Sequence, residues 1–438
     1  MLLPTGWKIA TVDELKANVP RSCAAGPFGS SISAQYFVES GVPVIRGGNL
    51  SDSGLKFIPE DFVFITEDRA RTFKGAQVVA GDLVFTCWGT LGQVGLIPSD
   101  GPFNYYVISN KQLKLRPNTE ICSAAFLFYY FSTEHLRRHF QDIAIGSAVP
   151  GINLGLLKRI KVPLPPLAEQ KKIAAILTAY DDLIENNKRR IALLEKMAEE
   201  IYREWFVRLR FPGHASTPVH KGVPEGWRRQ SLGTICSMVK RGISPGYDDQ
   251  AVTIVLNQRC IRGGAIDLGF ARTHSSDVPK EKVVQFGDAL INSTGVGTLG
   301  RVSVVGVEGS GWTVDSHITI CRANPLKAHP FYVAHTVKLL QTQFEFLASG
   351  ATGQTELNAS LVKAIAVLVP PSALSDQFGA IASDMSRQQC VLSQSTQNLQ
   401  KTRDLLLGRL ISGKLRVDQV DIQFPPNMRE SARMSYFN

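Results

Sequence analysis

The chain lacks the features that mark secreted, membrane and zinc-ribbon proteins. Its seven cysteines are far apart among 438 residues and form no Cys-x-x-Cys pair, so the sequence predicts neither a disulfide framework nor a zinc ribbon and fits a reducing cytoplasm. No apolar run reaches the roughly 18 residues that a membrane helix needs. The N-terminal residues also show no basic segment followed by an apolar core. Secretion and membrane spanning are therefore not expected.

Reactive constellations are scarce as well. There is no Gly-x-Ser-x-Gly elbow and no Asn-Pro-Pro-aromatic stretch of an amino-methyltransferase. Residues 295–300 match the Gly-x-Gly-x-x-Gly of dinucleotide sites, but a strand is predicted where such a site needs a helix. Residues 408–414 match a phosphate loop, yet Leu415 stands at the magnesium-binding Ser or Thr position. His135 and His139 lack the glutamate of a zinc-protease helix. A binding or adaptor protein without a metal is expected.

Composition indicates a folded protein with a preference for anions. Hydrophobic residues make up 44% of the chain, and 48 lysines and arginines against 38 aspartates and glutamates give a net charge of +10. A chain of this length can form more than one domain. The positive charge favours nucleic acid in bulk terms, although an ordinary basic protein has the same balance.

The sequence contains one long internal repeat. Four motifs recur in the same order: residues 4–8 at 224–228, 81–85 at 287–291, 90–94 at 298–302, and 161–166 at 366–371. A period of this length indicates two copies of a whole domain, each followed by the same connecting element. Short β-branched stretches bounded by Gly, Pro, Asn and Asp predict strands at 42–45, 83–86, 252–256 and 301–307. One helix near the end of each copy, at 123–143 and 330–347, makes each domain mixed α/β.

Two long helices are predicted after the two copies. Residues 168–208 contain no Gly or Pro and sustain a heptad, and at 1.5 Å per residue they span roughly 60 Å. Residues 375–411 repeat apolar residues every seventh position, but their second seam is poor. We therefore expect this helix to pair with the first one in the same chain, although two independent helices, each on its own domain, are the alternative. Tyr202, Trp205 and Phe206 predict either a partner interface or core packing.

The seam positions predicted for the two helices are as follows. In the first helix they are Leu177, Ile184, Ile191, Ala198 and Trp205, with Ile173, Tyr180, Asn187, Leu194 and Ile201. In the second they are Phe378, Met385, Leu392, Leu399 and Leu406, with Ala382, Gln389, Thr396, Arg403 and Leu410.

These motifs together resemble the specificity subunits of type I restriction-modification systems over nearly the whole chain. Residues 146–153 followed by 163–170 resemble the exit of a target recognition domain into its spacer helix, 291–301 resembles a second such domain, and 405–415 resembles the end of its spacer. The resemblance implies a mixed α/β fold in which two similar α/β target recognition domains are separated by two long antiparallel coiled-coil spacer helices. The implied bounds are 1–166 and 211–371 for the domains, 167–210 and 372–416 for the helices, and 417–438 for a C-terminal tail.

The resemblance also implies a function. The chain would be a non-catalytic, cytoplasmic DNA reader of a bipartite asymmetric duplex target, with each domain reading one half. Two modification subunits would bring S-adenosylmethionine and methylate adenine, and two restriction subunits would bring ATP and magnesium and cut DNA, so no cofactor is expected in this chain. Two alternatives stay open: a methylation-only or phage-defence relative without a restriction partner, and an enzyme that acts through residues 295–300.

Candidate DNA-contacting residues are polar or cationic side chains in loops between the predicted strands. In the first domain they are Arg46, Asn49, Arg69, Arg71, Lys74, Thr90 and Gln93. In the second domain they are Lys240, Arg241, Tyr247, Asn257, Gln258, Arg259, Arg262, Asn292, Thr294, Thr298 and Arg301. Residues 257–259 form the densest polar cluster directly after an apolar strand. Asn or Gln pairs with adenine and Arg with guanine, whereas a polar strand end facing water is the simpler interpretation.

Overall fold

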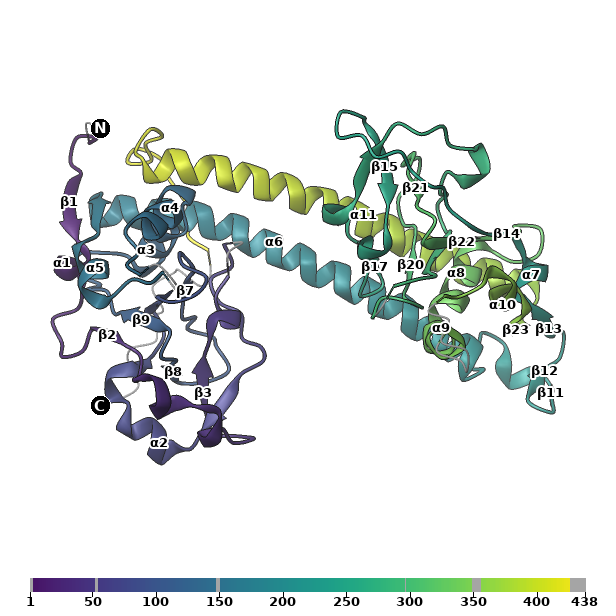
Figure 1. Cartoon of the computed structure of the whole chain (residues 1–438), viewed down its shortest axis with the longest axis horizontal. Coiled ribbons are helices and arrows are strands. Elements are labelled where there is room, and N and C mark those ends of the chain that lie inside the picture. Colours follow the sequence, from purple (N-terminus) through teal and green to yellow (C-terminus); the bar gives the residue numbers. More distant parts are fainter. Residues whose placement is uncertain (1–2, 52–53, 147–149, 296, 349–355, 426–438) are drawn as a thin grey trace. The chain divides into compact units, whose positions relative to one another are not determined.

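A computed structural model describes residues 3–51, 54–146, 150–295, 297–348 and 356–425 of the chain (Figure 1). It contains two compact units, one formed by residues 1–185 and 397–438 and the other by residues 186–396. Each unit holds one copy of the sequence repeat together with part of each long helix. Residues 147–149 and Val296, which belong to motifs discussed above, lie outside the described residues.

The first unit contains two four-stranded sheets. One has the order β2-β9-β6-β7 and is antiparallel throughout; the other has the order β4-β3-β8-β5, in which β3 and β8 are parallel. The first sheet consists of β2 (Cys23–Ala25), β9 (Gln112–Leu115), β6 (Leu83–Thr86) and β7 (Val94–Leu96), and the second of β4 (Val63–Ile65), β3 (Val42–Ile45), β8 (Tyr106–Ile108) and β5 (Gln77–Val78). A further pair joins β1 (Lys8–Thr11) to β10 (Lys161–Leu164). The strands predicted at 42–45 and 83–86 are confirmed.

The second unit repeats the order of the first sheet and three of the four strands of the second sheet, which confirms the repeat seen in the sequence. Its four-stranded sheet has the matching order β14-β22-β19-β20, and the second sheet has the order β18-β15-β21. The strands are β14 (Cys236–Arg241), β22 (Ile318–Ala323), β19 (Ala289–Asn292), β20 (Val302–Val304), β18 (Arg272–His274), β15 (Thr253–Leu256) and β21 (Thr313–Val314). Three small pairs are β13 (Arg228–Ser231) with β23 (Ala366–Val369), β16 (Ile261–Arg262) with β17 (Ala265–Ile266), and β11 (Val219–His220) with β12 (Val223–Pro224).

Each unit has two hydrophobic cores, and one strand lies between them: β6 in the first unit and its counterpart β19 in the second. Successive side chains of a strand point to opposite faces. Leu83 and Phe85 accordingly face the core shared with the helices, whereas Val84 faces the core between the two sheets. In the second unit Ile291 faces the core shared with the helices, and Leu290 faces the core between the two sheets. All of these side chains are buried, which explains why apolar residues occupy consecutive positions in both segments rather than alternate ones.

The prediction of a single helix near the end of each copy is wrong, because each segment forms two helices. Residues 123–143 hold α3 (Ala124–Phe131) and α4 (Glu134–Asp142), and residues 330–347 fall within α8 (Pro330–Leu339) and α9 (Gln341–Ala348). Thr133 starts a new helix because its side chain accepts the backbone N–H of Leu136, an N-cap bond. The remaining short helices are α1 (Val12–Leu15), α2 (Glu67–Thr72), α5 (Leu154–Arg159), α7 (Leu232–Ile235) and α10 (Ala359–Ala364).

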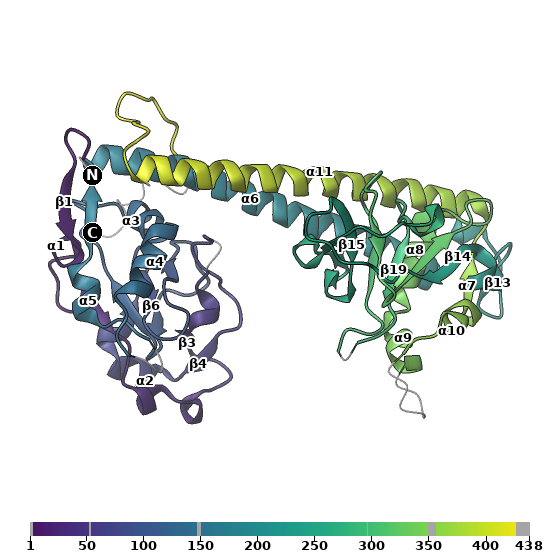
Figure 2. The ribbon, with the colours of Figure 1, turned by 45° about the horizontal axis from the view of Figure 1, so that its top comes forward.

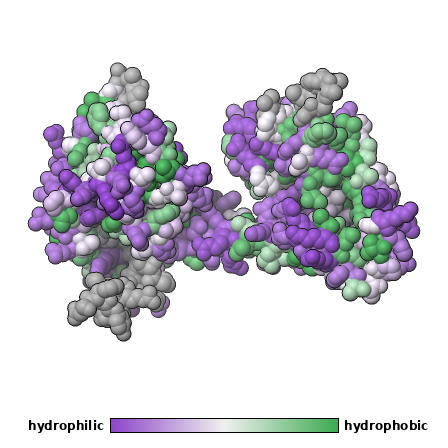
Figure 3. All heavy atoms as spheres, turned by 90° about the horizontal axis from the view of Figure 1, so that it is seen from below, coloured by the Kyte–Doolittle hydropathy of each residue, from purple (hydrophilic) through white to green (hydrophobic). Residues whose placement is uncertain are grey.

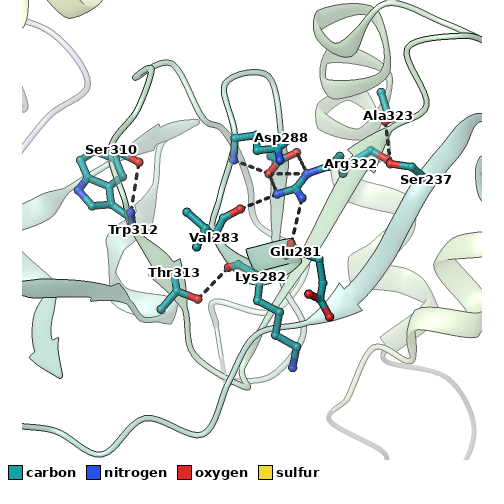
Figure 4. A network of polar contacts seen from close by, with 11 residues as sticks. Ser237, Glu281, Lys282, Val283, Asp288, Ser310, Trp312, Thr313, Arg322 and Ala323 are labelled. Carbon is teal, nitrogen blue, oxygen red and sulfur yellow. Dashed lines mark hydrogen bonds and ion pairs between the residues drawn. The ribbon is translucent and has the colours of Figure 1, made fainter. Parts of the chain in front are cut away.

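The repeated Gly-Asp motif builds the same ion pair in both units. Arg116 donates to the Asp82 carboxylate through Nε and Nη2, both at 2.7 Å. Arg322 donates to Asp288 from Nε at 2.9 Å and Nη2 at 2.7 Å, in the network of Figure 4. Each aspartate also accepts the backbone N–H of the residue three positions before it. The motif therefore marks a buried structural pair at the start of a central strand.

The two predicted long helices are present as α6 (Leu167–Tyr202), which continues into a π-helical turn Arg203–Val207, and α11 (Ser372–Ile411). In each unit they lie side by side (Figures 1 and 2). The predicted seam positions of both helices are buried or half-buried. In the second unit Asn187 Nδ2 donates to Ser395 Oγ at 3.4 Å and Gln389 Nε2 donates to the Ile191 carbonyl at 3.2 Å, so the pairing is antiparallel within one chain. In the first unit Arg403 forms an ion pair with Asp181.

The aromatic residues at the end of α6 belong to the core of the second unit. Tyr202 and Phe206 are buried, and both lie against Phe378 of α11 with ring centroids 5.5 and 5.3 Å away. Trp205 is half-buried and contacts the same ring at 6.2 Å. Of the two interpretations from the sequence, core packing is confirmed.

Asn187 is a buried polar residue in the helix seam and provides a test of that seam. Replacing Asn187 with leucine is expected to raise the thermal unfolding temperature, because a polar seam residue specifies register at a cost in stability. Its bond to Ser395, at 3.4 Å, is long and offsets little of its desolvation. Thermal unfolding followed by circular dichroism measures the change, with Asn186→Leu at a neighbouring exposed position as the control. A fall in unfolding temperature for Asn187→Leu alone would show that the amide stabilises the pair.

The glycine motifs that resemble nucleotide sites have structural roles. Gly295 and residues 297–300 lie between antiparallel strands β19 and β20, where Gly300 N donates to the Asn292 carbonyl at 2.8 Å. Residues 408–414 end helix α11, and Gly413 lies at φ +70° just beyond its last turn, as a helix C-terminus requires.

Across the described residues no three His, Cys, Asp or Glu side chains are grouped so that they could hold a metal ion. No helix in the described part of the chain is long and apolar enough to cross a membrane.

Candidate nucleic-acid interface

The two main polar clusters predicted in the second unit lie next to each other. One follows β15 and contains the short 3-10 helix Gln258–Cys260; the other follows β19 in the turn to β20. Asn292 Nδ2 joins them, because it donates to the carbonyls of Gln258 at 2.9 Å and Thr298 at 3.2 Å. Strands β15 and β19 belong to different sheets. The fold therefore brings together two loops that are about thirty residues apart in the sequence.

Two arginines of the first loop share one aromatic ring. The guanidinium carbon of Arg259 lies 4.5 Å from the Phe270 ring centroid and that of Arg262 lies 4.4 Å from it. The ring is itself fixed, because Asn257 Nδ2 donates to the Phe270 carbonyl. Both arginines are exposed. Arg262 Nε donates to the Arg259 carbonyl at 3.1 Å. Stacking orients guanidinium groups without neutralising them, so the other guanidinium N–H groups stay available to an anion or a base edge.

A second arginine–aromatic pair extends this surface. Arg272 of β18 lies over the Tyr247 ring at 3.5 Å, and both side chains are exposed. Tyr247 was predicted from the sequence, whereas Arg272 was missed. The signal for it was available, because a short polar strand pairing with β15 places its first residue near the cluster at 257–262.

The remaining predicted residues of the second unit surround the same turn. Thr294 Oγ1 lies 2.7 Å from His317 Nδ1, and Arg301 Nη2 donates to the Gly297 carbonyl at 2.7 Å. Arg241 forms an ion pair with Glu356, a residue that bridges to Thr294. Lys240 precedes Arg241 on β14 and is exposed. His317 and Glu356 were not predicted, because each comes from a segment with no local sign of a site.

The first unit places four of its predicted residues together in the matching position. Arg46 follows β3, and its backbone N–H donates to Asn49 Oδ1 at 2.8 Å. Gln93, from the β6–β7 connection, donates to the Leu50 carbonyl at 3.4 Å and accepts from Thr86 at 3.0 Å. Thr90 is exposed in that same connection. The loops after the first and second central strands thus meet in both units.

The other three predicted residues of the first unit form a separate group on α2 and the turn after it. Arg69 is half-buried; its guanidinium lies 3.7 Å from the Tyr36 ring centroid and donates to the Ser31 carbonyl. Arg71 and Lys74 are exposed. Arg71 forms a surface ion pair with Asp68, in which both side chains stay largely exposed.

Two predicted base readers are buried in this structure. Asn49 is 2% exposed, and its amide donates to the carbonyls of Ile58 at 3.1 Å and Glu60 at 2.7 Å. Asn292 is fully buried and joins the two loops described above. Both amides hold loops in place, and a base contact by either would require its loop to open. The exposed arginines are therefore the stronger candidates among the predicted residues.

Surface composition agrees with a polar binding face. Seen from below the view of Figure 1, each unit presents many hydrophilic residues, with apolar areas between them (Figure 3). The candidate loops of the second unit carry Arg241, Arg259, Arg262, Arg272 and Arg301. Glu356 pairs with Arg241. The net positive charge at these loops suits a phosphate backbone, and arginine also matches the acceptor pattern of guanine in the major groove.

Comparison with known proteins links this architecture to one family. A family model described as the type I restriction modification DNA specificity domain matches residues 29–196. The specificity subunit of the type I restriction enzyme MjaIX from Methanocaldococcus jannaschii is 24% identical over 349 residues, which span 74% of this chain and 78% of that protein. The HindI specificity subunit from Haemophilus influenzae is 30% identical over 110 residues, 25% of this chain and 24% of that protein.

A solved structure extends the likeness to nearly the whole chain. The crystal structure of a type I restriction-modification S subunit from M. genitalium matches with a TM-score of 0.60 at 17% identity, covering 94% of this chain and 98% of that one. At this identity the match shows a common fold. The predicted architecture of two similar α/β domains and two long antiparallel helices is confirmed.

Proposed function

We propose that this chain is a type I restriction-modification specificity subunit and that it reads a bipartite, asymmetric sequence in duplex DNA for a methylating and cleaving complex. One observation carries the proposal: in each unit, two loops that follow central strands lie next to each other. In the first unit these loops follow β3 and β6, and in the second they follow β15 and β19. The two copies place different side chains at this position, so each is suited to a different half of the target.

The division of the chain is part of the proposal. Residues 1–166 and 211–371 act as the target recognition domains, residues 167–210 and 372–416 as the spacer helices, and residues 417–438 as a tail. The described part of the tail lies on the first unit, where Lys172 Nζ donates to the carbonyls of Asp418 at 2.9 Å and Val420 at 2.8 Å. The proposed DNA-contacting set is the one predicted from the sequence without the buried loop ties Asn49 and Asn292, and with Arg272 and His317 added.

We further propose the partners and their cofactors. Two modification subunits carry S-adenosylmethionine and methylate adenine, and two restriction subunits bind ATP and magnesium, translocate DNA and cut it. This chain supplies sequence recognition, holds no cofactor and acts in the cytoplasm. Exposed apolar side chains on α6 support helix docking: Leu193 and Met197 are 52% and 50% exposed and lie one helical turn apart. The relatives described above are subunits of restriction enzymes, which disfavours a methylation-only system.

Adenine methylation provides the direct test. The chain is expressed with the modification subunit encoded beside it, and methylated adenines are mapped across the genome and compared with cells lacking this chain. A new motif of two short unlike blocks around a fixed gap is the expected result. If the complex assembles and no new methylation is found, the chain does not direct methylation and the proposal fails.

A further inference from the structure

One segment in each unit connects the candidate reading loops to the long helices. The first coupling segment comprises residues 46–51 and 54–60, and the second comprises residues 257–270. Each begins directly after the first central strand, with the residues predicted to contact DNA. Each then reaches a charged pair that includes one acidic residue of α6, Asp181 or Glu195, before the chain returns to its sheet.

The first coupling segment contacts both long helices of its unit. On α11, a β-carbon built on Gly54 would lie 3.4 Å from Arg403 Nη1 and Nη2. Lys56 Nζ donates to Thr178 Oγ1 of α6 at 3.0 Å and lies 5.7 Å from the Tyr129 ring centroid. Tyr129 in turn donates to Asp181 Oδ2 at 2.6 Å. Asp181 accepts Arg403 Nη1 of α11 at 2.9 Å, and the two side chains are only 15% and 12% exposed. These groups form the first node, in which α3, α6, α11 and the coupling segment meet.

The second coupling segment reaches an equivalent pair at a different place on α6. Lys338 of α8 forms an ion pair with Glu195 of α6 at 2.7 Å, and their side chains are 19% and 34% exposed. The turn of the β16–β17 hairpin presses against this pair. A β-carbon built on Gly264 would lie 2.8 Å from both Glu195 Oε1 and Lys338 Nζ. Gly264 also lies at φ +81°, so its backbone and close approach both favour glycine. These groups form the second node.

Both segments are closed by asparagine side chains and therefore cannot absorb movement easily. Asn49 bonds to the carbonyls of Ile58 and Glu60, and Asn257 bonds to the carbonyl of Phe270. In the second segment, Asp267 N also donates to the Cys260 carbonyl at 2.8 Å, across the neck of the hairpin. A displacement of the helix contact would therefore be transmitted to the loop start, where Arg46 or Arg259 lies.

We propose that the two nodes act as positioning sites that fix each reading loop relative to the spacer helix of its own unit. They thereby determine how strongly the complex prefers the native number of base pairs between the two target blocks over a shorter or longer gap. The positioning residues are Asp181, Arg403 and Lys56 in the first node, and Glu195 and Lys338 in the second. None of them contacts DNA in this scheme. The inference rests on the proposed function, because a gap has meaning only for a two-block target.

The test uses the complex of the full chain with its modification subunit. Duplexes carry the two blocks with the native gap, or with a gap one base pair shorter or longer, and the rate of adenine methylation is measured on each. The double variant Asp181→Asn, Glu195→Gln removes one charge from each node while it keeps shape. We expect its preference for the native gap to fall by roughly tenfold or more, because charge-assisted bonds in partly buried sites are lost. Recognition of the blocks should stay unchanged.

Two controls separate positioning from general damage. Glu200→Gln breaks an exposed pair with Arg208 at the end of α6, away from both segments, and should keep the native preference. Lys338→Arg preserves the ion pair and should do so too. An unchanged gap preference in the double variant, or an equal loss of methylation on all three duplexes, would overturn the inference. If the unaltered complex shows no two-block preference, the proposed function itself fails, whatever the variants do.

Discussion

Replacing Arg322 with methionine is expected to lower the free energy of unfolding of the second unit by about 3–5 kcal/mol near neutral pH, because it leaves a buried carboxylate without its partner. Arg322 donates to Asp288 through two nitrogens and to the carbonyls of Glu281 at 2.9 Å and Val283 at 2.7 Å (Figure 4). The Arg322 and Asp288 side chains are 13% and 2% exposed. Methionine fills similar volume but donates to none of the three acceptors.

The loss in Arg322→Met should depend on pH. Burial raises the pKa of Asp288 above its usual value, and Arg322 opposes that rise. Without the arginine the folded-state pKa rises further. A carboxyl with a raised folded pKa destabilises the fold when ionised, and this cost disappears as pH falls below that pKa. The difference in stability between variant and parent should therefore be smaller at about pH 5 than at about pH 8.

Hydrogen exchange measured by mass spectrometry on the full chain reports the two units separately. Peptides from β19 and β22 should exchange faster in Arg322→Met, while peptides from the first unit stay unchanged. Arg138→Met is the control, because its pair with Glu134 is 73% and 65% exposed and such pairs contribute about 0–1 kcal/mol. Equal protection of β22 in Arg322→Met and in the parent would show that the pair contributes little to stability.

The fold could be predicted from the sequence wherever a local pattern reflects a local cause. The segments at 42–45 and 83–86 have apolar residues at consecutive positions because they are central strands buried on both faces. The heptad at 168–208 predicted the long helix α6. The poor second seam of α11 disfavoured a zipper between two copies of α11, and so predicted that α11 pairs with α6 of the same chain. A single helix was predicted at the end of each copy because the hydrophobic spacing continues through the break. In the first copy the break is set by Thr133, which caps the second helix, α4.

The candidate site was less accessible to sequence reasoning, because it depends on which loops meet. The prediction that all candidate residues lie in loops is wrong for several of them, since the structure places Lys240, Arg241, Arg262 and Asn292 on strands and Arg69 and Arg71 on α2. The pattern also does not distinguish a solvent-facing side chain from one that closes a loop. Asn49 and Asn292 have the residue type of a base reader and are buried as loop ties. Arg272 and His317 are brought in by strand pairing and by the approach of a distant turn. The contact of His317 with Thr294 has no local signature in the sequence, whereas the short polar strand β18 was an available signal for Arg272.

Among the predicted contacts, Arg259 carries the largest expected effect on DNA recognition. Arg259→Ala should weaken binding to the native target by about 1–3 kcal/mol, roughly fivefold to 150-fold, and weaken binding to random duplex much less. The reason is geometric. Its guanidinium is held by Phe270, and its backbone N–H donates to Asn257 Oδ1 at 2.9 Å, so the exposed fork is oriented before DNA arrives. Little conformational entropy is then lost when it bonds to guanine.

Fluorescence anisotropy of the assembled complex on target and random duplexes at one fixed salt concentration measures this difference. Arg229→Ala, which removes an exposed arginine from β13, is the matched control and should change both affinities little. Equal weakening on both duplexes would assign Arg259 to the phosphate backbone, where a cation contributes affinity without sequence information. Unchanged binding would remove it from the interface. Selective weakening would identify the loop after β15 as a part of the second unit that distinguishes one base from another.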